Sequence, residues 1–132
     1  MTQFLGQISL LVDDYDRAIE YYTHILDFEL LEDQVLSPEK RWVVVRPKGG
    51  DSGANILLAK ANKPEQWSFI GNQTGGRVFL FLYTDDFDRD YDKFVQKGVK
   101  FVQDVREESY GKVCVFKDLY GNLWDFIQKK QL

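Results

Sequence analysis

Hydrophobic and polar residues alternate in two patterns along the chain, one typical of strands and one typical of helices. The same order of these patterns occurs twice. Apolar runs at 8–12 and 78–83 predict strands. After each run, apolar side chains recur every three or four residues, as on one face of an amphipathic helix. These side chains are Tyr15, Ala18, Ile19, Tyr22 and Ile25 or Leu26 in the first copy, and Phe87, Tyr91, Phe94 and Val95 in the second. Three shorter strand-like runs then follow in each copy, at 28–33, 41–45 and 55–58, and at 99–104, 112–116 and 122–125.

The two copies also share their sequence. Asp-Asp-Tyr-Asp-Arg at 13–17 recurs as Asp-Asp-Phe-Asp-Arg at 85–89, 72 residues later. The matched strand-like runs keep nearly the same offset, which favours an internal duplication over chance. We therefore expect an α+β fold, in which a single domain (1–132) contains two β-α-β-β-β modules. The first spans approximately 1–62, the second approximately 76–132, and a linker at 63–75 joins them.

The ends of the predicted helices carry capping signals. Asp13 or Asp14, and Asp85 or Asp86, stand where a carboxylate would accept hydrogen bonds from the first backbone N–H groups of a helix. Gly98 stands where a helix commonly ends in a left-handed residue. Capping therefore explains the acidic pairs better than metal binding does.

Strand alternation predicts which side chains face away from the helices. Apolar positions such as Leu10 and Leu82 would pack against the helices. The opposite face would then carry a mixture of aromatic and polar groups, which is the composition of a small-molecule pocket. Its predicted members include Gln7, Leu57, Arg77, Phe79, Phe81, Tyr83 and Asp125. From the same alternation, Cys114 could face this pocket.

Composition narrows the classes of function. The 132-residue chain contains one Cys and one His, so neither a disulfide framework nor a two-His metal site can form within it. Its net charge of −4 disfavours a nucleic-acid partner. The longest apolar run has six residues, far below the roughly 20 of a membrane helix, and no signal peptide is evident. We therefore expect a cytoplasmic protein without membrane contact.

Two segments resemble the vicinal oxygen chelate superfamily, which includes glyoxalase I, the bleomycin-resistance proteins and extradiol dioxygenases. The first runs from Val12 to Tyr22 and continues to Phe28, where the family reads V-x-D-x-x-x-A-x-x-F-Y and then L-G-F. The second runs from Phe116 to Ile127, where the family reads F-x-D-P-x-G-N. Asp27 replaces the usual Gly and Leu119 the usual Pro. The resemblance implies cupped mixed sheets of the glyoxalase/bleomycin-resistance type, and commonly a homodimer.

The resemblance also implies where a metal would bind. Family enzymes hold a divalent ion through His, Glu or Gln at four strand positions, which match Gln7, Leu57, Arg77 and Asp125 here. Leu57 cannot bind a metal, and Arg77 repels a cation. Gln7 and Asp125 remain as weak candidates, so we expect no cofactor, with a divalent metal as the alternative. Arg77 could instead pair with Asp125 or bind an acidic group of a ligand.

The favoured function is metal-independent binding of a small molecule, of the sequestration type, in an aromatic cavity. The expected ligand-binding residues are Gln7, Leu57, Arg77, Phe79, Phe81, Tyr110 and Asp125. The alternative is a metal-dependent lyase or isomerase of the glyoxalase I type, so the residues leave open whether the protein is an enzyme. For Tyr110 a turn role competes with ligand binding.

Three further residues have simple structural explanations. His24 lies on the first predicted helix, where we expect a surface or packing role. Cys114 has no His to activate it, so we expect a buried, inert thiol. Trp67 lies in the linker and could either pack or cover the cavity.

Overall fold

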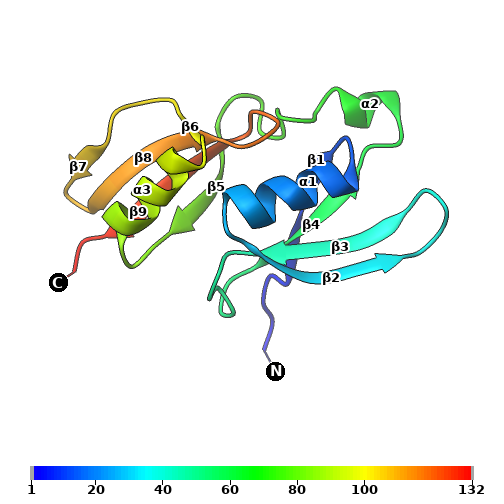
Figure 1. Cartoon of the computed structure of the whole chain (residues 1–132), viewed down its shortest axis with the longest axis horizontal. Coiled ribbons are helices and arrows are strands. Elements are labelled where there is room, and N and C mark those ends of the chain that lie inside the picture. The colour runs from blue at the N-terminus through cyan, green and yellow to red at the C-terminus, as the bar shows by residue number, and fades with distance from the viewer. Residues whose placement is uncertain (1, 132) are drawn as a thin grey trace. The chain divides into compact units, whose positions relative to one another are not determined.

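The computed structural model describes residues 2–131, which divide into two compact units, the first ending at Ile70 and the second beginning at Gly71. The boundary falls inside the 63–75 segment expected to be the linker. Each unit holds one mixed sheet and its own helical segments (Figure 1). Within residues 2–131, no helix is both long and apolar enough to cross a bilayer.

The first unit forms a four-stranded sheet in the order β1-β4-β3-β2. β1 is parallel to β4, with Gln7 opposite Asn55, whereas β3 is antiparallel to both of its neighbours. The first and last strands of the unit therefore lie side by side. Its elements are β1 (Gln7–Val12), α1 (Tyr15–Glu20), η1 (Tyr21–Ile25), β2 (Glu29–Val35), β3 (Arg41–Arg46), β4 (Asn55–Lys60) and α2 (Pro64–Trp67).

The second unit repeats this plan. Its sheet has the order β5-β9-β8-β6, with β7 added beside β8, and β5 is parallel to β9. Its elements are β5 (Val78–Tyr83), α3 (Phe87–Gln96), β6 (Lys100–Phe101), β7 (Arg106–Glu108), β8 (Gly111–Lys117) and β9 (Leu123–Lys129). The predicted α+β fold with a duplicated β-α-β-β-β plan is thus confirmed.

Local structure departs from the prediction in three places. The first helix continues past Glu20 as the π-helix η1 rather than as a regular α-helix. The run at 99–104 forms only the two-residue strand β6, and the extra strand β7 follows it. The linker segment contains the short helix α2, where Pro64 occupies the first turn, in which its missing N–H costs nothing.

The predicted helix ends are confirmed. Asp14 accepts a hydrogen bond from the Arg17 amide, and Asp86 accepts one from the Arg89 amide. Gly98 has a φ of 85°, and its amide donates to the Val95 carbonyl at the end of α3. An Asp side chain therefore caps the start of α1 and of α3, and a left-handed Gly ends α3.

One face of each sheet packs against its helix. In the second unit, the rings of Phe87 and Phe94 on α3 lie 4.9 and 5.2 Å from that of Phe126 on β9. The Phe116 ring stacks on Trp124 at 5.6 Å, and Trp124 is 2% exposed. In the first unit the corresponding residues Leu10 and Leu58 are fully buried. Trp124 is therefore a core residue of the second unit.

A tight turn between β8 and β9 is organised by one carboxylate. Asp118 Oδ1 accepts from the backbone amides of Tyr120, Gly121 and Asn122 at 3.0–3.1 Å. Its Oδ2 accepts from Asn122 Nδ2 at 3.1 Å and from Trp124 Nε1 at 3.0 Å. Asp118 is only 6% exposed, so these bonds replace its lost hydration.

Asp27 takes the left-handed conformation, with φ at 61°, at the position where the family usually has Gly. Asp27→Gly is expected to raise the free energy of unfolding by about 0.5–1 kcal/mol, because glycine has no Cβ to strain this backbone. The exposed contact between Asp27 and Lys48 Nζ, 3.4 Å long, is worth little. Urea unfolding would measure the change. Asp27→Ala keeps the strain, so an equal gain in that variant would contradict the explanation.

Candidate functional site

The candidate site lies on the face of the second unit's sheet that points away from α3. Phe126 packs against α3, so its neighbours on β9, Leu123, Asp125 and Ile127, point to the other side. In the ladders, Asp125 is level with Phe81 on β5 and with Val115 on β8. We call this surface the Asp125 face; its members are Phe81, Tyr83, Arg106, Glu108, Val113, Val115, Leu123, Asp125, Ile127 and Lys129.

Asp125 sits at the centre of this face among apolar neighbours. It is half-buried, and within residues 2–131 its carboxylate makes neither a hydrogen bond nor an ion pair. Burial raises the pKa of Asp125, and the positive charge of Arg106 opposes part of that rise. The face therefore carries a carboxylate whose bonding capacity is not used within its own unit.

The expected partner of Asp125, Arg77, is elsewhere in the unit. Arg77 is exposed in a bend directly before β5 instead of lying on the strand, and no ion pair joins it to Asp125 within residues 2–131. Its carbonyl accepts a hydrogen bond from the Thr74 hydroxyl, which fixes the bend. Its placement on the first strand of the second module was therefore wrong.

The duplication identifies the residue that does occupy that position. Adding the 72-residue offset to Gln7 gives Phe79, not Arg77. The β5–β9 register shifts between Val78 and Leu80, so Phe79 is bulged and has no partner in the ladder. Phe79 is half-buried, whereas Phe81 is 56% exposed.

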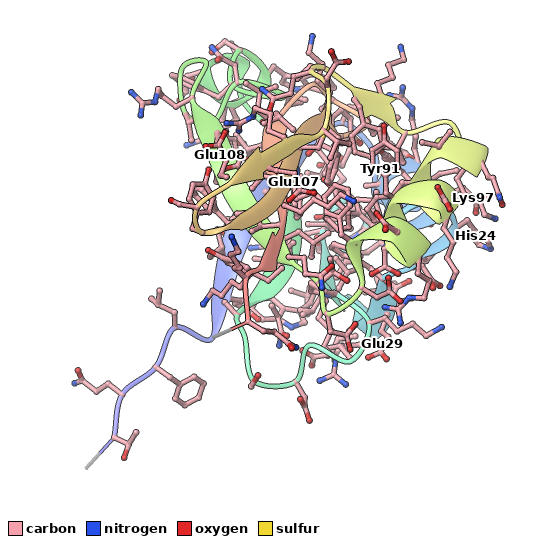
Figure 2. All side chains as sticks on the ribbon, turned by 90° about the vertical axis from the view of Figure 1, so that its left-hand side faces the viewer. His24, Glu29, Tyr91, Lys97, Glu107 and Glu108 are labelled. Atoms are coloured by element: carbon pink, nitrogen blue, oxygen red, sulfur yellow. The ribbon has the colours of Figure 1, made fainter. Side chains whose placement is uncertain are left out.

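A basic residue that the sequence did not single out does act on Asp125. Arg106 on β7 is level with Val113, which places it on the Asp125 face. Its guanidinium bonds Glu108 Oε1 at 3.0 Å and Gln103 Oε1 at 2.8 Å. Figure 2 places Glu107 and Glu108 on this strand. Residues two apart on a strand share a face. Recognising 106–108 as a strand would therefore have placed Arg106 and Glu108 side by side.

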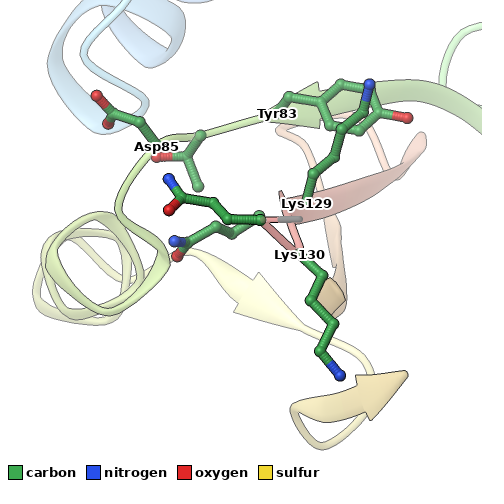
Figure 3. Close-up of a pocket in the computed structure, with 7 residues that line it drawn as sticks. Tyr83, Asp85, Lys129 and Lys130 are labelled. Atoms are coloured by element: carbon green, nitrogen blue, oxygen red, sulfur yellow. The ribbon is translucent and has the colours of Figure 1, made fainter. Parts of the chain in front are cut away.

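One end of the face opens into a surface pocket of about 560 Å³ (Figure 3). The Nζ of Lys129 lies 4.9 Å from the centre of the Tyr83 ring, a cation–π contact. Lys130, directly after the end of β9, points the other way (Figure 3). The lining residues are Tyr83, Thr84, Asp85, Gln128, Lys129, Lys130 and Gln131.

Tyr110 lies in the turn between β7 and β8. Its side chain is 54% exposed, and its carbonyl accepts a hydrogen bond from the Lys130 amide at 2.9 Å. The backbone of Tyr110 therefore has a turn role, and its phenol group is accessible at the edge of the second unit.

The two candidates in the first unit occupy the equivalent face of their own sheet. Gln7 lies on β1, and Leu57 lies on β4 opposite Ser9; both are half-buried. Nearby on this face, Arg46 Nε bonds Glu29 Oε2 at 2.8 Å, which lowers the pKa of Glu29. This face therefore holds an ion pair, as the Asp125 face does in Arg106 and Glu108.

Cys114 faces the helix side of its sheet, not the Asp125 face. It is level with Phe126 in the β8–β9 ladder, is fully buried, and its thiol donates to the Gln103 carbonyl at 3.1 Å. Burial raises the pKa of the thiol, so little thiolate forms. The predicted orientation of Cys114 was wrong, whereas its expected burial is confirmed.

His24 and Trp67 are both surface residues. His24 Nδ1 lies 3.0 Å from Glu20 Oε2 in an exposed pair on the first helical segment, which agrees with the expected surface role. Trp67 ends α2 and is 50% exposed, so it does not pack into a core.

The residues do not fit a four-ligand metal site of the family type. In the first unit the last-strand position is Leu57, and in the second the first-strand position is Phe79, so each unit supplies one oxygen donor at most. Across residues 2–131, no three His, Cys, Asp or Glu side chains gather in a way that could hold a metal ion.

The pKa of Asp125 predicts a pH-dependent effect on stability. Asp125→Asn should raise the melting temperature at pH 7, because the folded protein resists ionisation of this half-buried carboxyl. A carboxyl whose pKa is higher in the folded than in the unfolded protein stabilises the fold fully below the ordinary Asp pKa of about 3.9. This stabilisation is lost as the pH rises through the pKa of the folded protein. The gain should therefore vanish near pH ~3. The exposed Asp92→Asn on α3 is the control; a gain at both pH values would contradict burial as the cause.

Comparison with known proteins gives a consistent result. Residues 4–126 match the family model described as Glyoxalase/Bleomycin resistance protein/Dioxygenase superfamily. An uncharacterized protein of Shewanella frigidimarina is 56% identical over 129 residues, which cover 97% of this chain and 95% of that protein. The crystal structure of UcmS2 is 27% identical with a TM-score of 0.81, covering 96% of this chain and 98% of that one. TnmS3, an antibiotic binding protein from Streptomyces sp. CB03234, is 27% identical with a TM-score of 0.77, covering 98% of both chains.

Proposed function

Because the chain belongs to the Glyoxalase/Bleomycin resistance protein/Dioxygenase superfamily, we propose that it binds a small organic molecule on the Asp125 face without using a metal ion. Binding of this kind sequesters the molecule and requires affinity but no chemical step. The observation that carries the proposal is the half-buried, unpaired carboxylate of Asp125 beside the exposed ring of Phe81.

The composition of the Asp125 face supports a binding role. Small-molecule sites are mostly apolar or aromatic, with a few polar groups that fix the orientation of the ligand. Here Phe81 and Tyr83 are 56% and 54% exposed, an unusual number of accessible rings for one short strand. Val113 and Val115 on β8, the strand between β9 and β7, add apolar side chains to this face, although they are only 1% and 7% exposed.

The donor set supports independence from a metal. Family-type sites need ligands from the first and last strands of both modules, and Leu57 and Phe79 offer no lone pair for a divalent ion. The structural relative TnmS3 is an antibiotic binding protein, which supports a binding role over a catalytic one.

The test compares binding with and without chelator. We expect purified protein to bind planar aromatic compounds saturably by calorimetry, with the same affinity after treatment with EDTA. Phe81→Ala should lower the affinity about 2–13-fold, because aromatic ring contacts contribute roughly 0.5–1.5 kcal/mol. Val95→Ala is the matched control, since Val95 is 52% exposed but lies on α3, on the other side of the sheet.

The rival function is a metal-dependent lyase or isomerase of the glyoxalase type. A stoichiometric divalent ion in the purified protein, together with metal-dependent turnover of methylglyoxal in the presence of a thiol, would replace our proposal with that one. Loss of binding after EDTA treatment would also overturn it.

A further inference from the structure

We infer that the ligand of this protein carries an N–H or O–H donor at the edge of an aromatic ring, and that Asp125 selects it by accepting that hydrogen bond. The inference rests on the proposed function, which it deepens by naming a ligand class. Its basis is the position of one carboxylate beside one ring on neighbouring strands.

The β5–β9 ladder brings Phe81 beside Asp125. Asp125 and Phe81 are level in the parallel β5–β9 ladder and point to the same face of the sheet. Neighbouring strands lie about 4.8 Å apart, so the carboxylate and the ring are adjacent. A planar ligand that stacks on the exposed Phe81 ring therefore presents its edge to Asp125.

The Asp125 carboxylate has hydrogen-bonding capacity that no group of its own unit uses within residues 71–131. An ionised carboxylate accepts hydrogen bonds and donates none. The other charged groups near it are already engaged: Arg106 bonds Glu108 at 3.0 Å, and Lys129 lies 4.9 Å from the Tyr83 ring. The half-buried carboxylate of Asp125, in contrast, has no side-chain partner within residues 71–131.

Asp125 distinguishes ligands that carry a hydrogen-bond donor from ligands that do not. A ligand that lacks a donor would cover the carboxylate without bonding it and would remove part of its hydration. Covering a charge in this way is costly, whereas a hydrogen bond to a charged group contributes about 1.5–3 kcal/mol. Asp125 thus favours donor-bearing rings and rejects capped ones of the same shape. The raised pKa of Asp125 is consistent with a carboxylate that is poorly solvated.

The experiment uses two probes that differ in one donor. 2-Naphthol carries an O–H group, and 2-methoxynaphthalene has the same rings with that group methylated. Calorimetry on the full chain should find 2-naphthol bound at least about 10-fold more tightly. Asp125→Asn should reduce this ratio, and Asp125→Ala should bring it to about 1–2. Asp92→Asn makes the same change of charge on exposed α3 and should leave the ratio unchanged.

The possible outcomes separate the inference from the proposed function. Equal affinities for the two probes, or a ratio that survives Asp125→Ala, would overturn the inference and leave the binding function standing. If neither probe binds saturably up to its solubility limit, the proposed function fails with it. Amide chemical shifts give a second readout: 2-naphthol should move the signals of Asp125 and Phe81, and movement confined to α3 would contradict the site.

Discussion

Asp118→Ala is expected to lower the free energy of unfolding by about 3–5 kcal/mol. The Asp118 carboxylate accepts hydrogen bonds from three backbone amides and from the side chains of Asn122 and Trp124. Alanine would leave these donors unsatisfied in a region where Asn122 and Trp124 are 3% and 2% exposed. The cost of several unmet buried donors exceeds that of a typical single substitution.

Two further variants test this explanation by urea unfolding. Asp118→Asn keeps an acceptor for the three amides, but its NH₂ group would face the donors of Asn122 and Trp124, so we expect an intermediate loss. Asp16→Ala removes an Asp whose side chain is 81% exposed and pairs with Arg41, and should cost less than about 1 kcal/mol. A similarly small loss for Asp118→Ala would show that the turn does not depend on its carboxylate.

Gly71→Ala is expected to lower the free energy of unfolding by about 3 kcal/mol. Gly71 has a φ of 78°, and a Cβ there would lie 2.0 Å from the carbonyl oxygen of Tyr120. Because that atom belongs to the turn organised by Asp118, it cannot move without disturbing the turn. The substitution therefore adds a steric clash to the cost of the left-handed backbone.

Gly75 provides a matched control for this effect. Its φ of 69° is similar, but a Cβ there would meet no atom within 4 Å. Gly75→Ala should therefore cost only about 1 kcal/mol, the conformational part alone. Thermal unfolding of both variants measures the difference. Equal losses would mean that the close approach to Tyr120 contributes nothing.

The fold could be predicted because its signals are local and occur twice. The Asp-Asp-aromatic-Asp-Arg repeat marks both helix starts, and Asp14 and Asp86 do cap these helices. The extra strand β7 was missed because Arg-Glu-Glu carries no apolar alternation. Its strand conformation comes from pairing with β8, a tertiary effect that local propensity does not contain.

The site was predicted less completely, because burial on both faces of a strand and the start of strand pairing are not evident from the sequence. Cys114 lies between Val113 and Val115, and all three are buried, so alternation cannot tell which face is which. Arg77 precedes β5 because pairing with β9 begins only at Val78, opposite Leu123. Asp125 was identified correctly as lying away from the helix side, since its neighbours Trp124 and Phe126 mark the core.

The pairing of first and last strands has a consequence for how the protein is made. β1 cannot complete its sheet until β4 has been synthesised, because Gln7 pairs with Asn55, and β5 waits in the same way for β9. Chains fold largely from the N-terminus as they leave the ribosome, and contacts between distant residues form slowly. We therefore expect assembly during translation in two separate steps. The aromatic strand β5 would stay unpaired until β9 has emerged, and during this interval its exposed apolar side chains favour aggregation of the nascent protein.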